Sequence, residues 1–230
     1  MGGRSLAVAL ALIVVVAVCV VPVTPRAQPG APLPGMMPGG VLLPAEMGSC
    51  CGGFHVGSWV EYSVFRIATR QLWHLHFAAV GREGSAWWIE MTMSEARRGE
   101  ATVRMLMEEG EGGREDRVRR LIIQPEGQIP LELPVSEASA QLPQLDAGSG
   151  PAVFVGAEQL RLRPGTFATR HYRRGEGDAA HHIWLSEDVA LWGLARYHSP
   201  TVRLTLVGQG RGAASRVTGE PVPFDPASLR

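Results

Sequence analysis

Apolar and polar side chains alternate with a period of two along most of the chain from Val56 onward, and this pattern constrains the fold more than any other feature. In residues 59–67, for example, Tyr62 falls on one side and Glu61 on the other. A period of two places successive side chains on opposite faces of a β-strand. The candidate strands are 59–67, 71–79, 85–93, 103–107, 118–123, 153–163, 166–173, 181–185, 201–207 and 213–218.

The segments between these runs indicate how the strands are joined. Gly-containing turns are predicted at 81–84 and 175–178, so that neighbouring strands run antiparallel. Prolines interrupt residues 124–144, where one short helix is expected at 136–142 with Ser136 as its cap. The sequence therefore predicts a mainly β protein, an up-and-down antiparallel sheet with at most one or two short helices.

The N-terminus has the layout of a secretory signal peptide, which we expect over residues 1–27. Arg4 supplies the positive charge, residues 6–21 form an unbroken apolar run, and Pro22 ends it. Two alternatives stay open, a retained membrane anchor and a lipoprotein signal with Cys19 as the acylated residue. Pro25 makes the bond after Ala27 a poor cleavage site, so export is expected without a defined cut position.

Residues 28–55 are predicted to be a Pro/Gly-rich linker, followed by a β domain over 56–220 and a flexible tail over 221–230. Cys50 and Cys51 stand at the end of the linker. Adjacent Cα atoms lie about 3.8 Å apart, too close for an unstrained disulfide. Free thiols and links between chains are both open, with a redox switch as a further alternative.

Composition and motifs exclude several classes of function. The 22 basic and 22 acidic residues balance, which argues against a nucleic-acid binder that relies on net charge. No G-x-S-x-G nucleophile motif and no phosphate-binding glycine loop is present. The expectation is a protein that is not an enzyme and that holds no cofactor.

Several stretches resemble exported bacterial proteins of the LolA, LolB and LppX-like lipoprotein-carrier group. They are GSWVEY at 57–62, WWIE at 87–90, RPGTF at 163–167, HY at 171–172, IWLS at 183–186 and VALWGL at 189–194. Ala190 stands where that group usually has proline. The resemblance implies a curved antiparallel half-barrel, a place in the periplasm or at the outer membrane of a Gram-negative-type bacterium, and an acyl chain or lipoprotein as partner.

A ligand of this kind is expected on the concave face of the sheet. The candidate lining residues are Trp73, Phe77, Trp87, Met91, Met105 and Met107. Aromatic and methionine side chains suit an acyl chain, because each buried methylene contributes about 0.8 kcal/mol and methionine adapts to irregular shapes. The competing interpretation is that these side chains form an ordinary core, in an envelope scaffold without a ligand cavity.

The histidines and carboxylates give weaker indications of a functional site. His74 and His76 share a strand face, and His171 should lie near the pair at 181–182, where Glu176 or Asp178 could complete a metal site. Adjacent histidines point to opposite faces of a strand, so we expect solvated side chains and no metal. Glu61 and Glu90 are expected as outward-facing residues.

Overall fold

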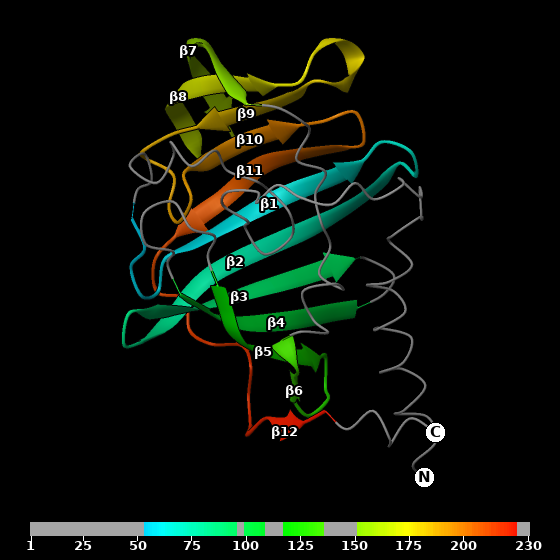
Figure 1. Cartoon of the computed structure of the whole chain (residues 1–230), viewed down its shortest axis with the longest axis vertical. Coiled ribbons are helices and arrows are strands. Elements are labelled where there is room, and N and C mark those ends of the chain that lie inside the picture. The colour runs from blue at the N-terminus through cyan, green and yellow to red at the C-terminus, as the bar shows by residue number, and fades with distance from the viewer. Residues whose placement is uncertain (1–52, 96–98, 109–116, 136–150, 225–230) are drawn as a thin grey trace.

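The computed structural model of the chain describes residues 53–95, 99–108, 117–135 and 151–224 (Figure 1). In these ranges the chain forms β-strands and one short 3-10 helix. The elements are β1 (Trp59–Arg66), β2 (Gln71–Glu83), β3 (Ala86–Glu95), β4 (Gly99–Glu108), β5 (Arg117–Pro125), β6 (Leu131–Leu133), β7 (Ala152–Leu162), β8 (Gly165–Arg174), η3 (Gly177–Ala179), β9 (His181–Leu185), β10 (Leu194–His198), β11 (Val202–Gly210) and β12 (Val222–Pro223).

The strands form one open sheet with the order β12-β6-β5-β4-β3-β2-β1-β11-β10-β9-β8-β7. From β1 in the middle, the chain runs as a meander to β6 near one edge. It then continues at the opposite edge with β7 and returns as a second meander to β11, which pairs with β1. Neighbours are antiparallel except β6 and β12. The mainly β, curved antiparallel sheet predicted from the sequence is confirmed (Figure 1).

The main core covers the face of the sheet to which the alternating apolar side chains point. Val60 on β1 faces Phe77 on β2, which faces Met91 on β3, which in turn faces Val103 on β4. All four side chains are buried in one apolar cluster. Each such buried side chain contributes about 1.5–3 kcal/mol, so the alternation fixes which face of each strand is buried.

The opposite face carries a smaller apolar cluster beneath the segment 211–219. Val217 of this segment packs with side chains from β3, β4 and β5, and the cluster members are Ala86, Trp88, Leu106, Ile122 and Val217. The strand predicted at 213–218 is therefore wrong. The segment crosses the sheet and is held by side chains, since Gln124 accepts a hydrogen bond from the backbone N–H of Thr218 at 2.9 Å.

Other differences concern short elements and turns. The turn predicted at 81–84 is tighter, because β2 extends to Glu83 and β3 begins at Ala86. The short strands β6, β10 and β12 were not predicted, and β12 lies in the segment expected as a flexible tail. The helix expected at 136–142, the signal peptide, Cys19, Cys50 and Cys51 lie outside the described residues. Within the described ranges no helix is long and apolar enough to span a membrane.

Candidate functional site

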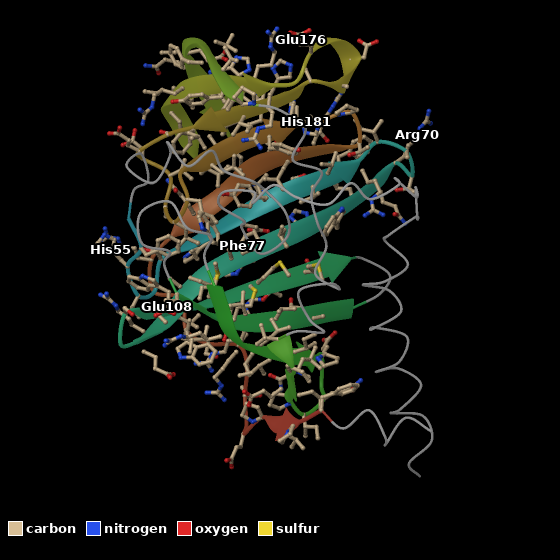
Figure 2. The ribbon with its side chains drawn as sticks, in the orientation of Figure 1. His55, Arg70, Phe77, Glu108, Glu176 and His181 are labelled. Carbon is tan, nitrogen blue, oxygen red and sulfur yellow. The ribbon has the colours of Figure 1, made fainter. Side chains whose placement is uncertain are left out.

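The six side chains proposed from the sequence share one face of three adjacent strands. Phe77 on β2 is directly opposite Met91 on β3, and Trp87 on β3 is opposite Met107 on β4. All six belong to the main apolar cluster or pack against it. Figure 2 places Phe77 near the middle of the sheet. We call this set, which is Trp73, Phe77, Trp87, Met91, Met105 and Met107, the apolar face.

Exposure differs across the apolar face. Met91 and Met105 are at most 1% exposed, and Phe77 and Met107 are 5% exposed. Trp73 and Trp87 are only partly buried. Trp73 faces Val64 on β1, four residues along β2 from Phe77, so it lies about 13 Å from Phe77 along the strand. The methionines therefore form the buried centre, and the two tryptophans lie toward its margins.

Two aromatic residues from outside the strands also contact this face. Phe54 precedes β1, and its ring centroid lies 5.6 Å from that of Trp87. Trp192, in the loop between β9 and β10, meets Phe77 edge to face with centroids 5.1 Å apart, and meets Phe54 at 5.5 Å. Sequence reasoning missed both residues as part of this face. Trp192 belongs to the VALWGL stretch noted in the sequence. The alternation of apolar and polar side chains identifies strands, however, and does not indicate where a loop residue packs.

The loop that carries Trp192 is fixed by its own backbone and by Gln209 of β11. Leu191 has a φ of 60° and Gly193 a φ of 72°, so two backbone positions are left-handed. The backbone N–H of Ala190 donates to Oε1 of Gln209 at 3.0 Å, and Nε2 of Gln209 donates to the carbonyl of Asp188 at 2.9 Å. Proline has no N–H, so alanine at position 190 is what permits the first of these bonds.

Tyr62 joins the core to β10. Its hydroxyl donates to the carbonyl oxygen of Leu194 at 2.9 Å, and its ring meets Phe77 edge to face with centroids 6.3 Å apart. Burial raises the pKa of the Tyr62 phenol well above its ordinary value. Tyr62 is therefore a neutral hydrogen-bond donor at any physiological pH, and it offers no anionic group to a ligand.

Glu90 corrects one expectation, because it is not an outward-facing residue. Its side chain is 2% exposed, beneath the segment 211–219. Its carboxylate accepts hydrogen bonds from the Ser215 hydroxyl at 2.5 Å and from the Arg216 backbone N–H at 2.7 Å. Glu61 is more exposed, and its Oε1 lies 3.1 Å from Nδ1 of His74. Glu61 therefore contacts a histidine on the neighbouring strand, whereas the buried carboxylate of Glu90 holds the segment 211–219 against the sheet.

The histidines expected near one another on the second meander do meet. Nε2 of His171 lies 2.9 Å from Nδ1 of His182, and the ring of His171 stacks on Trp184 with centroids 4.4 Å apart. His181 points away from them, with Nδ1 2.6 Å from the hydroxyl of Tyr197. Among the side chains that the structure describes, no three His, Cys, Asp or Glu residues are arranged to hold a metal ion.

The histidines of the first meander are separated from this group. The ring of His76 stacks on Trp59 with centroids 5.5 Å apart. Burial, together with the nearby positive charge of Arg216, lowers the pKa of His76. His76 is therefore neutral at neutral pH and contributes mainly its ring to the polar face of the sheet.

No protein-family model matches the sequence, and no curated protein matches it. Solved structures with some likeness include a protein of Parabacteroides distasonis that is provisionally classed as a lipoprotein, with a TM-score of 0.34, 9% identity, and coverage of 68% of this chain and 96% of that one. Another is a provisionally classed exported protein with a YmcC-like fold from Bacteroides fragilis, with a TM-score of 0.32, 10% identity, and coverage of 68% and 97%. Similarity at this level does not assign the chain to a family.

Proposed function

We propose that this protein is exported to the bacterial envelope and binds an acyl chain, free or carried by a lipoprotein, on its apolar face. Export is supported by the charge, apolar run and proline of residues 1–27. The periplasm or the outer membrane is the proposed location. The proposed role involves no catalytic step and no cofactor, because recognition of an acyl chain requires only apolar surface.

The contact between methionine and aromatic side chains of three adjacent strands is the observation that carries the acyl-chain proposal. Met91, Met105 and Met107 belong to one continuous apolar cluster with Phe77 and Trp87. Methionine is unbranched and polarisable, so its side chain can rearrange around a flexible chain at small cost. Every methylene removed from water contributes about 0.8 kcal/mol, less the cost of ordering the ligand.

A second function is favoured by a different observation. Phe54 and Trp192 already pack on Phe77 and Trp87, so the chain covers part of the apolar face with its own aromatic rings. Met105 has no exposed surface at all. A face filled in this way is what an envelope scaffold or interaction protein of the same fold would need, with no ligand.

Substitution of Trp87 by glutamate separates the two functions. A carboxylate beside the methionines would have to lose its hydration to accommodate an acyl chain, which is costly. We expect Trp87→Glu to reduce uptake of a fluorescent fatty acid about tenfold or more while the β-type circular dichroism is retained. The full-length protein is titrated with the fatty acid, and the fluorescence change gives the affinity.

Trp59→Glu is the matched control, because Trp59 is also a partly buried tryptophan but stacks on His76 on the other face. It should leave fatty-acid uptake unchanged. Equal uptake by the wild type and Trp87→Glu would contradict binding at the apolar face. A wild-type protein that takes up no fatty acid would support the scaffold instead.

A further inference from the structure

Four adjacent strands of the second meander, β8 to β11, carry basic side chains and no acidic ones. Inside the four strands the basic residues are Arg170, His171, Arg173, Arg174, His181, His182, Arg196, His198 and Arg203, and no Asp or Glu occurs there. The acidic residues Glu176, Asp178, Glu187 and Asp188 lie in the loops that join the strands. The chain as a whole is neutral. The strands themselves therefore carry only positive charge, whereas the acidic residues of this region stand in its loops.

Four of these residues form a row across the strands. Arg173 on β8 is directly opposite His182 on β9. His182 is opposite His198 on β10, and His198 is opposite Arg203 on β11. Directly opposite side chains on adjacent antiparallel strands have Cβ atoms about 4.5–5.5 Å apart. We call Arg173, His182, His198 and Arg203 the cationic row.

The cationic row lies on the face of the sheet opposite the main core. His198 and Arg203 alternate along their strands with Tyr197 and Leu204, which are buried in the main cluster. Arg173 and Arg203, at the ends of the row, are exposed, while His182 and His198 between them are half-buried. A ligand can therefore reach all four side chains from solvent.

Beside the cationic row lies a second one, built on Trp184. Trp184 is opposite His171 on β8 and Arg196 on β10. The guanidinium of Arg196 lies over the Trp184 ring, 5.6 Å from its centroid. Nε of Arg196 is buried and makes no hydrogen bond within the part of the chain that the structure describes. An additional cationic donor thus borders the row.

Two carboxylates contact these strands, and both contact residues outside the cationic row. Glu158 on β7 accepts a hydrogen bond from Nε1 of Trp184 at 2.6 Å and lies 3.7 Å from Nδ1 of His171. Glu187 pairs with Arg170 at 3.2 Å. Within the described ranges, no carboxylate pairs with Arg173 or Arg203.

The electrostatic effect of this arrangement is seen at the imidazoles. Burial, followed by the positive charges of Arg196 and Arg203 and by His182, lowers the pKa of His198 to about 4. Burial, followed by His182, lowers the pKa of His171, against the opposing effect of Glu158. In the unliganded protein at neutral pH, both of these rings are neutral.

We propose that the cationic row binds an oxyanion, namely a phosphate group, on the face of the sheet opposite the apolar face. The two terminal guanidinium groups supply charge-assisted donors, and the His198 imidazole supplies an N–H donor. His182 offers only its Nε2, because its Nδ1 meets Nε2 of His171. The phosphate could belong to a free phosphate compound or to a phospholipid headgroup. This site is independent of acyl-chain binding.

The site should bind anions more tightly as the pH falls. An anion in the row favours the protonated form of His198, so binding raises the pKa of this ring and takes up a proton. Acidification therefore assists binding. The charged and titratable groups that face the row from the packed strands are Glu158 and His171 at one side, and Arg196 beside His198. Of these, only Glu158 opposes an anion.

Calorimetric titration of the full-length protein with inorganic phosphate tests the proposal. We expect saturable binding that is weakened about tenfold or more in Arg173→Gln/Arg203→Gln, since this variant loses both charge-assisted donors at the ends of the row. Arg211→Gln is the matched control. Arg211 is also exposed but lies past the far end of β11 from Arg203. It should bind as the wild type does.

The dependence of anion affinity on pH is measured with sulfate, whose charge is constant between about pH 8 and pH 5. Sulfate affinity should rise across this range in the wild type, and rise less in His198→Gln. Sedimentation with vesicles tests whether the bound phosphate belongs to a lipid headgroup. Vesicles of phosphatidylglycerol are compared with vesicles of phosphatidylcholine. Sedimentation with the former only, lost in the double arginine variant, indicates a lipid headgroup, while binding of free phosphate without vesicles indicates a soluble compound.

Absence of saturable binding by the wild type to phosphate, sulfate and vesicles would overturn the proposal. Equal weakening by Arg211→Gln and by the double variant would overturn it as well, because that result indicates attraction by overall charge. Circular dichroism verifies that each variant is folded, and the substituted arginines are exposed, so folding should be retained.

Discussion

Glu90 is the residue at which local pattern and tertiary packing disagree most. Alternation along β3 places it correctly on the face opposite the main core, but that face is covered at Glu90 by the segment 211–219. A buried carboxylate is tolerated only when its oxygen atoms accept hydrogen bonds. Ser215 and the backbone N–H of Arg216 supply them, and Arg104 lies 3.8 Å away. Glu90 therefore fixes the segment to the sheet.

Replacement of Glu90 by alanine should destabilise the protein by about 2–3 kcal/mol, because the Arg216 N–H and the Ser215 hydroxyl lose their acceptor. Urea unfolding followed by circular dichroism measures the loss. Glu187→Ala is the control, since it also removes one carboxylate, but from an exposed ion pair. Similar losses in the two variants would show that Glu90 does not anchor the segment.

At the scale of elements, the strands were predictable because alternation is a local property of the sequence. β1, β2 and β3 have the faces expected of them, and so the six residues of the apolar face share one surface as predicted. Phe54 and Trp192 were missed because they reach that surface from segments without a period of two. The segment 213–218 alternates in sequence, but alternation cannot reveal whether a neighbouring strand pairs with it.

The loop between β9 and β10 gives a test at this scale. Gln209→Ala removes the acceptor of the Ala190 N–H and the donor to the Asp188 carbonyl. We expect faster hydrogen–deuterium exchange at residues 186–193, because these two bonds tie the loop to β11. The loss of stability should be about 1–2 kcal/mol.

Gln124→Ala is the matched control for this loop. Gln124 also clamps a distant segment in both directions, through the N–H and the carbonyl of Thr218. Its substitution should increase exchange near Thr218 and leave residues 186–193 protected. Unchanged exchange at 186–193 in Gln209→Ala would mean that Gln209 does not hold the loop.

At the scale of the whole molecule, two meanders meet at β1 and β11 and present two different faces. One face is apolar and rich in methionine. The other carries the cationic row on β8 to β11 and the anchored segment 211–219 over β3 to β5. Sequence reasoning could not give this topology, because nothing local indicates that the chain after β6 continues at the opposite edge of the sheet. The cationic row depends on the register of four strands, so it was equally invisible.

Mass spectrometry of the protein extracted from its native membranes tests the acyl-chain proposal most directly. Spectra recorded under conditions that preserve noncovalent complexes should show a species heavier than the processed chain by the mass of a lipid, and denaturation should release that lipid. The account predicts this loss of mass together with recovery of a fatty acid or lipid in the organic extract. The mass of the bare processed chain in both conditions, with no lipid in the extract, would contradict it.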